Sequence, residues 1–296
     1  MNSSVPYLLA ILGEGVVSPS TMVCHADDLG LVRGDGVFDT TRIVTAQDGT
    51  SRIDHLDEHL SRFARSIAGV NGPTPDLDSW NHLIEEAART WRIPGEAALK
   101  LVYTNGRQVV PGPPRGFLII SPLSETAIEE REGIDVLCLS RGVTSDAFAD
   151  APWLLGGVKT LSYAVNVAAL RYARSQGADD AIFTSTDGYL LEGPTSGLVI
   201  AADDSLWTTP TGTTGILSSI TVSTVFEATG EVGVQTSTRL MKRDEVLRAQ
   251  GAWLLSSVRG VAPILSIDGH PAPQDEDMTH RLRTWAGFEN LSLIHI

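Results

Sequence analysis

The chain has 296 residues, of which 42% are hydrophobic and 20% are charged, and its formal net charge is −14 at pH 7. This composition is ordinary for a globular protein, and the length suffices for one large domain or two smaller ones. The negative charge, together with the lack of any Lys/Arg cluster in the sequence, argues against a nucleic-acid partner but leaves small anions open as ligands.

The sequence also bears on membranes and cysteine chemistry. No apolar run reaches the ~18 residues that a bilayer-spanning helix needs, and the opening MNSSVPYLLAILGEG has no basic residues before its short apolar stretch. We therefore expect a cytoplasmic protein without a membrane partner. Cys24 and Cys138 lie far apart and form no CxxC pair, so neither a disulfide framework nor a cysteine zinc site is indicated. We expect both to be buried as small apolar residues.

The first part of the chain alternates strand-like with helix-like segments. The strand-like ones are GVFDTTRIV (36–44), ALKLVYTNG (98–106) and GFLIIS (116–121), and the helix-like ones are IDHLDEHLSRFARSIAGV (53–70) and DSWNHLIEEAARTWRI (78–93). This order predicts an α/β or α+β domain over residues 1–122. The acidic stretch that follows predicts an interdomain linker over residues 123–133.

The rest of the chain is richer in strand-like segments, namely IDVLCLSRG (134–142) and GAWLLSSVRGVAPILSIDG (251–269), with a helix-like SSITVSTVFEATG (218–230) before the second. The Asp187-Gly188 pair between strand-like runs predicts a hairpin turn, because such turns need a positive φ. We expect a strand-rich domain over residues 134–290. Residues 291–296 have no turn or capping pattern, and we interpret them as a tail.

A single lysine, Lys159, stands among glycines and small apolar residues in GGVKTLSYA. The apolar spacing after it predicts a helix that begins near residue 161 and buries one stripe, formed by Leu161, Ala164, Val165, Ala168 and Tyr172. A lysine is rarely buried without a partner, and desolvation lowers the pKa of its amine toward the neutral form that a Schiff-base nucleophile or proton carrier needs. The alternative is a surface lysine that extends its ammonium group into water.

Two further segments supply groups that complement such a lysine. Glu192 in LEGPTSG is either a solvated strand end or a carboxylate that keeps the ring nitrogen of a pyridine cofactor protonated. In GILSSITVSTVFE, Ser218 and Ser219 are good N-cap residues for a helix. The backbone N–H groups of Ile220 and Thr221 would then be open to a phosphate. By itself this pattern is also that of an ordinary helix cap.

Together these pieces resemble a known family, the class IV or fold-type IV pyridoxal phosphate enzymes, which includes branched-chain and D-amino-acid aminotransferases and 4-amino-4-deoxychorismate lyase. The resemblance covers nearly the whole chain. It is carried, in order, by RGDGVFDTTRIV, HLDEHLSRFARS, ALKLVYTNG, VKTLSYAVNVAALRYARSQGADDAIFTSTDGYLLEGPTSGLVI, GILSSIT and SSVRGVAPILSIDG. It implies a smaller N-terminal α/β domain, a larger strand-rich C-terminal pseudo-barrel domain that binds pyridoxal 5′-phosphate, and a homodimer in which each subunit supplies a loop to the other's pocket.

The resemblance also implies roles for individual residues. Lys159 forms the Schiff base with the cofactor and moves the substrate proton, and Glu192 pairs with the pyridine nitrogen. The phosphate is bound by Arg62 together with residues at the helix start and on a late strand, namely Ser219, Ile220, Thr221 and Ser257. Without the resemblance, Arg62 reads equally as a surface charge and Ser257 as an ordinary strand hydroxyl.

The chain departs from the family pattern at two positions. Gly197 stands where many members have Asn, which leaves a supporting hydrogen bond missing or replaced. Ala164 stands where the branched-chain enzymes have a tyrosine that bonds the cofactor. Its neighbour Tyr163 would lie ~100° away around a helix, and we do not transfer the tyrosine's role to it.

The expected substrate is an amino acid or aminodeoxychorismate. Lys100 resembles the lyases, which have lysine in this strand, and FDTTR resembles the lyase pattern of hydroxyl residues after a phenylalanine, whereas its aspartate is closer to the transaminases. The resemblance therefore predicts a lyase that forms 4-aminobenzoate and pyruvate, with a D-amino-acid or branched-chain transaminase as the alternative. The candidate substrate-binding residues are Phe38, Thr40, Arg42, Lys100, Arg107 and Arg259, although each of these cations could also be a surface charge.

Other motifs in the sequence suggest different function classes. HLDEH (55–59) matches the inverted zinc-protease signature H-x-x-E-H, with two histidines one helical turn apart. The sequence offers no convincing third ligand, so we expect no metal site. GDGVF and GEGVV lack the third glycine of a dinucleotide loop and are interpreted as turns. A non-catalytic binding protein on the same fold remains an alternative, but it would not need Lys159.

Overall fold

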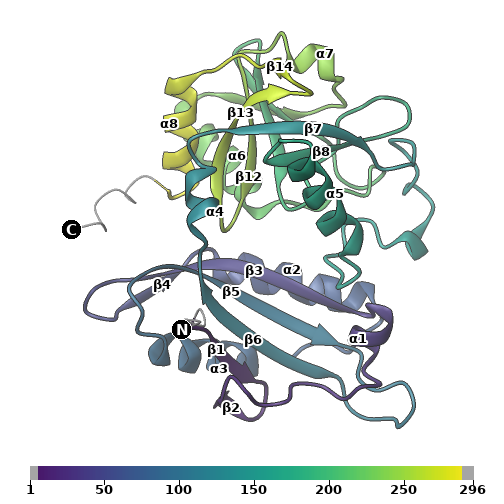
Figure 1. Cartoon of the computed structure of the whole chain (residues 1–296), viewed down its shortest axis with the longest axis vertical. Coiled ribbons are helices and arrows are strands. Elements are labelled where there is room, and N and C mark those ends of the chain that lie inside the picture. Colours follow the sequence, from purple (N-terminus) through teal and green to yellow (C-terminus); the bar gives the residue numbers. More distant parts are fainter. Residues whose placement is uncertain (1–5, 289–296) are drawn as a thin grey trace. The chain divides into compact units, whose positions relative to one another are not determined.

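The chain folds into two compact units (Figure 1). A computed structural model describes residues 6–288, except for the side chain of Glu231. The N-terminal unit contains the residues up to Ser124 together with Val158–Tyr163. The C-terminal unit contains Glu125–Gly157 and the residues from Ala164 onward. Lys159 therefore belongs to the N-terminal unit, whereas the sequence placed it within the region 134–290.

The N-terminal unit is built on an antiparallel sheet with the strand order β2-β1-β6-β5-β3-β4 within the described residues. Its longest strands, β3 and β5, pair over their full length, from Gly36 opposite Thr104 to Thr45 opposite Gly95. The strands are β1 (Leu8–Ile11), β2 (Gly15–Val17), β3 (Gly36–Thr45), β4 (Ser51–Ile53), β5 (Gly95–Thr104) and β6 (Arg115–Pro122). The three predicted strands of this region are confirmed.

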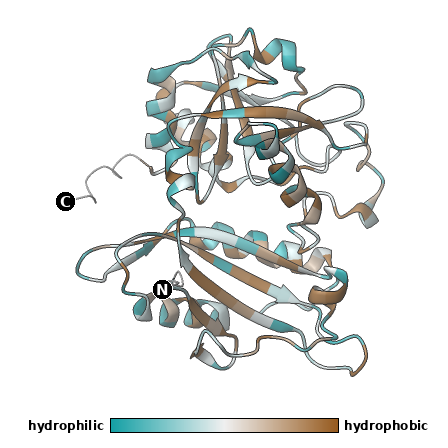
Figure 2. Cartoon of the chain, in the orientation of Figure 1, coloured by the Kyte–Doolittle hydropathy of each residue, from teal (hydrophilic) through white to brown (hydrophobic). Residues whose placement is uncertain are grey.

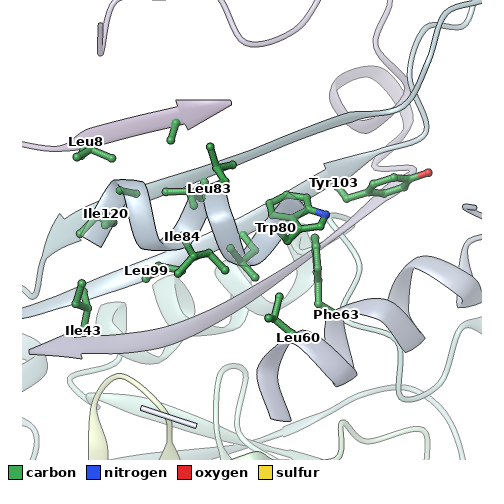
Figure 3. Close-up of a cluster of buried hydrophobic side chains, with 14 of the residues drawn as sticks. Leu8, Ile43, Leu60, Phe63, Trp80, Leu83, Ile84, Leu99, Tyr103 and Ile120 are labelled. Atoms are coloured by element: carbon green, nitrogen blue, oxygen red, sulfur yellow. The ribbon is translucent and has the colours of Figure 1, made fainter. Parts of the chain in front are cut away.

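Two amphipathic helices, α2 (Leu56–Gly69) and α3 (Leu77–Thr90), cover one face of this sheet, and a short helix α1 (Leu29–Arg33) precedes β3. The side chain of Asp76 caps α3 by accepting from the backbone N–H groups of Asp78 and Ser79. Between helices and sheet lies the core shown in Figure 3, where the rings of Phe63 and Trp80 meet edge to face at 5.1 Å. Both predicted helices are confirmed.

The segment Val158–Tyr163 is held in the N-terminal unit by backbone pairing with the start of β3. Phe38 N–H donates to the carbonyl of Lys159 at 3.0 Å, and Leu161 N–H donates to the carbonyl of Gly36 at 2.9 Å. Gly36 is required at this crowded point, because an added Cβ would lie 2.4 Å from the carbonyl oxygen of Tyr103. These hydrogen bonds are the physical reason why Lys159 packs with the first unit.

The C-terminal unit is built on a mixed sheet with the strand order β11-β10-β9-β12-β13-β7-β8, and β14 pairs with β13 beside this path. β7 runs parallel to both β8 and β13, whereas β9 and β12 are antiparallel. The strands are β7 (Ile134–Ser140), β8 (Asp180–Thr184), β9 (Gly197–Ala202), β10 (Ser205–Thr208), β11 (Gln235–Thr238), β12 (Gly251–Ser256), β13 (Gly260–Ile267) and β14 (His270–Pro271).

Both faces of this second sheet are buried. Leu198 and Leu254 belong to one apolar core, and their neighbours Val199 and Leu255 belong to another on the opposite face. Much of both sheets is therefore hydrophobic, whereas α8 is largely hydrophilic (Figure 2). The helical segments are α4 (Glu125–Glu129), a 3₁₀ turn (Pro152–Leu154), α5 (Ala164–Ser175), α6 (Ile220–Val232), α7 (Arg243–Val246) and α8 (Glu276–Trp285).

Helix α5 differs from its prediction. It begins at Ala164 rather than near residue 161, and its buried residues are Ala169 and Ala173. Val165 and Tyr172 of the predicted stripe are 66% and 52% exposed, so the prediction of a buried stripe was wrong. Small alanine side chains let the helix approach β7 and β8 closely, and the larger apolar side chains consequently point away from the sheet.

The predicted linker 123–133 contains α4, and the predicted tail 291–296 lies outside the described residues. Cys24 is exposed, so its predicted burial was wrong. Cys138 is partly buried on β7, and burial raises the pKa of its thiol to about 12. Among the residues that the structure describes, no helix has the length and apolar character to cross a membrane.

The predicted turn at Asp187-Gly188 is present. Gly188 has φ +89° and its N–H donates to the carbonyl of Ser185 at 3.0 Å, while Ser185 N–H donates to the carbonyl of Tyr189. The carboxylate of Asp187 accepts from both the N–H and the hydroxyl of Ser145. The turn returns the chain to Leu190, which pairs with Thr184 and so leads directly to Glu192.

Candidate active site

Lys159 is half-buried against two aromatic rings of its own unit. Its Nζ lies 4.6 Å from the centroid of the Phe38 ring and 5.6 Å from that of Tyr163. The two rings meet edge to face, with their centroids 5.1 Å apart. An ammonium group over aromatic faces is attracted by their negative charge density. Lys159 is therefore held at a sheltered position. Tyr163, to which the sequence analysis gave no role, contacts it through its ring.

Helix α2 packs along the backbone of the lysine segment. Lys159 N–H donates to the hydroxyl of Ser66 at 3.3 Å. One turn further on, Gly69 leaves room for Val158, since an added Cβ would lie 2.7 Å from a methyl group of Val158. Arg62 precedes Ser66 by four residues and therefore lies on the same side of α2. The helix thus places the predicted phosphate-binding arginine one turn from the contact with Lys159.

Arg62 belongs to a buried polar network with Asp39 and His59. Its Nε donates to Asp39 Oδ2 at 2.8 Å and its Nη2 to Oδ1 at 2.7 Å, so the carboxylate binds one edge of the guanidinium. His59 Nδ1 lies 2.7 Å from the same Oδ1. All three side chains are buried, and Arg62 is not the surface charge that the sequence left open.

The network changes the acid–base properties of two of its members. Burial by itself would raise the pKa of Asp39, but hydrogen bonds from Arg62 and His59 outweigh it and hold the pKa below its ordinary value. Burial lowers the pKa of His59, and the neighbouring Asp39 offsets only part of this effect. His59 is therefore neutral near pH 7 and donates its Nδ1–H to Asp39.

A second cation, Lys100, lies near Lys159 on the sheet. Lys100 is paired with Thr40 in the register of β3 and β5, and its Nζ lies 5.6 Å from the centroid of the Phe38 ring. Phe38 and Thr40 alternate with Asp39 and so project from the sheet face opposite the one that α2 covers. The structure thus brings together three predicted substrate-binding residues, namely Phe38, Thr40 and Lys100, of which Lys100 is exposed.

The remaining predicted substrate-binding cations are engaged elsewhere in ion pairs. Arg42 is fully buried, with Nη2 2.6 Å from Asp54 and Nη1 3.0 Å from Glu96. Arg107 is half-buried, with Nε 2.8 Å from Asp27. A guanidinium already neutralised by two buried carboxylates is poorly suited to a substrate anion, and this argues against the predicted role of Arg42.

Arg259 is likewise buried. Its Nη1 lies 2.7 Å from Asp180 and 2.8 Å from Glu130, and its Nη2 donates to Ser196 at 3.0 Å. These contacts join the turn between β12 and β13 to β8, to the chain after α4 and to the GPTSG segment. They support a structural role for Arg259 rather than the predicted substrate contact.

Glu192 is oriented by two donors within the C-terminal unit. Its Oε2 accepts from the N–H of Leu217 at 3.0 Å, and its Oε1 lies 3.3 Å from Arg141 Nη1. The guanidinium of Arg141 also lies over the rings of Phe148 and Phe183, at 5.5 and 5.7 Å. Sequence reasoning missed Arg141. The sequence feature that could have identified it is its position directly after β7. The neighbouring strand β8 leads into the hairpin turn that precedes Glu192.

The start of helix α6 has the geometry of an anion site. Ser219 is its N-cap and accepts from Val222 N–H at 3.3 Å, which confirms the predicted cap. Helix geometry leaves the N–H groups of Ile220 and Thr221 without partners inside the helix. The Thr221 hydroxyl lies 3.1 Å from that of Ser257, so hydroxyl and amide donors converge. Such a donor set suits a phosphate group.

Gly197 lies close beneath this helix start. An added Cβ would lie 2.9 Å from a Val222 methyl carbon and 3.0 Å from Ser219 Cβ. The close approach explains why this chain has a residue without a side chain at this position. Helix α6 rests directly on the beginning of β9.

The zinc-protease interpretation finds no support in the geometry. His59 is buried in the network with Asp39, and His55 is the N-cap of α2 with a left-handed backbone (φ 49°). Within residues 6–288, no three His, Cys, Asp or Glu side chains are grouped as potential ligands of a metal ion. The H-x-x-E-H pattern therefore reflects the start of α2 and the network around Arg62.

Comparisons with known proteins identify the family of this chain. The model of the class IV amino-transferases matches residues 36–267. The bifunctional aminodeoxychorismate lyase / D-amino acid transaminase of Mycobacterium tuberculosis is 36% identical over 90% of this chain and 93% of its own length. A solved structure of a hypothetical aminotransferase from the same organism, in its PLP-bound form, has a TM-score of 0.89, 36% identity and coverage of 96% of this chain and 99% of its own.

A third comparison supports the fold class. The fold IV-transaminase CpuTA1 of Curtobacterium pusillum has a TM-score of 0.87 and 36% identity, and covers 95% of this chain and 99% of its own. The predicted two-domain α/β architecture of fold type IV is thereby confirmed, as is dependence on pyridoxal 5′-phosphate.

Proposed function

Because the chain belongs to the class IV aminotransferase family of pyridoxal phosphate enzymes, we propose that it converts 4-amino-4-deoxychorismate to 4-aminobenzoate and pyruvate. The observation that carries the proposal is the 36% identity, over 90% of the chain, to a relative whose name includes this lyase activity. The placement of Lys100 beside Phe38, near Lys159, supports it from the structure.

We propose that the cofactor's phosphate is bound by Arg62 and by the donors at the start of α6, listed above as Ser219, Ile220, Thr221 and Ser257. The charge and the convergent hydroxyl and amide donors of these residues support this assignment. When bound, the cofactor supplies an electron sink for the negative charge that develops on the substrate. Glu192 accepts from Leu217 N–H and Arg141, and its carboxylate would keep a proton on the ring nitrogen.

Lys159 acts in this proposal as both attachment point and proton carrier. Its amine would remove the proton from the carbon that bears the substrate nitrogen. The bond between the ring carbon and the enolpyruvyl oxygen then breaks, the ring becomes aromatic, and a proton returned to the enolpyruvate methylene carbon yields pyruvate. Lys100 binds a substrate carboxylate through its ammonium group.

The experiment is an incubation of the purified protein with aminodeoxychorismate, in which 4-aminobenzoate is followed by its fluorescence. We expect formation of 4-aminobenzoate that stops in Lys159→Ala. In Lys100→Met we expect the KM for aminodeoxychorismate to rise by about tenfold or more, because one charged hydrogen bond to a carboxylate is lost. No 4-aminobenzoate from a protein that carries bound cofactor would refute the lyase assignment.

D-amino-acid transamination is a second candidate, because the same relative is named for both activities. Incubation with D-alanine and 2-oxoglutarate tests it through the formation of pyruvate and glutamate. Glutamate is the product to follow, since it forms whichever amino donor is used. L-valine or L-leucine in place of D-alanine tests the branched-chain alternative in the same assay.

We further propose that the enzyme works as a cytoplasmic homodimer. Apolar side chains on α1 and on the loop between β5 and β6 support the dimer, because Leu31 is 65%, Val109 74% and Val110 51% exposed in the single chain. Asp27, in the segment before α1, accepts hydrogen bonds from Arg107 and from the N–H groups of Val109 and Val110, and so holds this loop against that segment. Sedimentation of wild type and Val109→Asp tests the proposal, with a shift toward monomer expected in the variant.

A further inference from the structure

The hydrogen bonds between Arg62 and Asp39 set the orientation of the arginine side chain. Two guanidinium nitrogens, Nε and Nη2, bind the two oxygens of one carboxylate at 2.8 and 2.7 Å. A fork of this kind sets the plane of the guanidinium as well as its distance. An unrestrained arginine side chain loses conformational entropy when it binds an anion. Because the fork already orders the Arg62 side chain before the anion binds, this entropy cost of binding is smaller.

His59 holds the carboxylate in turn. Its Nδ1 lies 2.7 Å from Asp39 Oδ1, and its Nε2 makes no hydrogen bond to any of the residues that the structure describes. A buried polar nitrogen without a partner is unfavourable, so packing alone does not explain a histidine here. The ring is only 1% exposed, which leaves the bond to Asp39 as the polar contact that accounts for its orientation.

The network of Arg62, Asp39 and His59 lies on the same two elements, β3 and α2, that hold the segment of Lys159. Asp39 directly follows Phe38, whose N–H bonds the Lys159 carbonyl and whose ring lies under the Lys159 ammonium group. Arg62 lies one helical turn before Ser66, whose hydroxyl accepts from the N–H of Lys159. A carboxylate that joins β3 to α2 at this level therefore fixes the arginine relative to the lysine.

We propose that Asp39 and His59 are positioning residues for the phosphate site, in which Asp39 orients the Arg62 guanidinium and His59 orients Asp39. This inference rests on the proposed function of Arg62 as a phosphate ligand. Neither Asp39 nor His59 is required to touch the cofactor. Their effect is on how tightly the cofactor's phosphate is bound, and it is transmitted through Arg62.

The test compares the binding of pyridoxal 5′-phosphate and of pyridoxal, which lacks the phosphate, to the apoenzyme. Dissociation constants are measured by absorbance and by quenching of tryptophan fluorescence. For Asp39→Asn we expect pyridoxal phosphate to bind about tenfold or more weakly, since a charge-assisted fork is lost. We expect the affinity for pyridoxal to change by less than about twofold, because the position of Lys159 is set by other contacts.

Two comparisons separate positioning from a general structural effect. The first uses the ratio of the dissociation constants for pyridoxal phosphate and pyridoxal. This ratio should be the same in the double variant Arg62→Ala/Asp39→Asn as in Arg62→Ala alone, because the effect of Asp39 passes through Arg62. The matched control is Asp54→Asn, which removes a carboxylate from the buried pair with Arg42 on the same strand. It should lower stability to a similar degree but leave the ratio at the wild-type value.

The outcomes distinguish this inference from the function on which it rests. An unchanged ratio in Arg62→Ala would remove Arg62 from the phosphate site, and the inference would fall with that assignment. A changed ratio in Arg62→Ala with an unchanged ratio in Asp39→Asn would overturn the inference alone. If Asp39→Asn does not fold, His59→Leu decides the question. It should weaken pyridoxal phosphate selectively by about threefold, and an unchanged ratio would count against the proposal.

Discussion

The backbone N–H of Lys159 donates a hydrogen bond to the hydroxyl of Ser66 at 3.3 Å, and this bond ties the lysine to helix α2. Together with the pairing of the Lys159 carbonyl to Phe38, it holds both peptide groups of the lysine in place. The long side chain can then move between proton donor and acceptor while its attachment to the fold stays fixed.

Replacement of Lys159 by alanine should abolish the absorption band near the visible edge that the Schiff base with pyridoxal phosphate produces. Turnover should fall by about 10²–10⁴-fold or more, because the proton carrier is lost along with the attachment point. Absorbance spectra of the reconstituted protein and product assays measure the two effects. Lys100→Ala is the matched control and should keep the band. A band that persists in Lys159→Ala would place the Schiff base on another lysine.

Replacement of Gly197 by alanine should displace the start of α6, since the new Cβ would lie 2.9 Å from Val222 and 3.0 Å from Ser219. We expect a loss of about 1–3 kcal/mol in the free energy of unfolding from this overpacking, together with weaker binding of pyridoxal phosphate. Urea denaturation and cofactor titration measure these changes.

The matched control for Gly197 lies in the same helix. Gly230 is exposed in α6, and an added Cβ there would meet nothing within 4 Å. Gly230→Ala should therefore stabilise the protein by about 0.5–1 kcal/mol and leave cofactor affinity unchanged. Equal affinities in the two alanine variants would show that α6 tolerates the extra methyl group at Gly197.

Replacement of Arg259 by methionine should destabilise the fold rather than change substrate selectivity. The substitution would leave Asp180, which is 1% exposed, without its partner at 2.7 Å. Breaking a buried pair in this way costs about 3–5 kcal/mol of unfolding free energy. Arg107→Ala, which removes a half-exposed pair with Asp27, should destabilise the fold much less, because water screens that pair. Thermal unfolding measures both, and similar losses would contradict the structural role of Arg259.

The stability of the protein should fall as the pH is lowered through the range set by His59 and Asp39. The pKa of buried His59 is lowered, so only the unfolded chain gains its proton below about pH 6.5, and stability decreases from there downward. The pKa of Asp39 is also lowered. Its stabilising contribution is therefore present above about pH 4, the ordinary value, and is lost below it.

Urea denaturation of wild type and His59→Leu between pH 5 and 8 measures the histidine part of this dependence. His59→Leu should remove a slope of at most about 1.4 kcal/mol per pH unit below pH 6.5. His82→Gln, at an exposed position of α3, is the control. Parallel pH curves for wild type and His59→Leu would show that His59 takes up no additional proton on unfolding.

Local patterns in the sequence were sufficient for most of the secondary structure and for several site residues. Apolar spacing identified α2 and α3, and the Ser219 cap identified the start of α6, because these signals depend on neighbours within a few residues. The same reasoning failed for α5. Its alanines and its larger apolar residues carry similar periodicity, and only the packing against β7 and β8 decided which face is buried.

The sequence by itself determined the chemical types at the site, namely a lysine among glycines and small apolar residues, a carboxylate after a hairpin turn, and a helix start rich in hydroxyl groups. Only the tertiary structure decided which charges pair. Asp39 binds Arg62 and His59, and Arg141 reaches Glu192. Arg42, Arg107 and Arg259 pair with other carboxylates. These partners come from different elements, and with 36 acidic residues in the chain no local signal distinguishes one carboxylate from another. Strand pairing and helix packing make that choice, because an ion pair needs its two groups within a few ångströms.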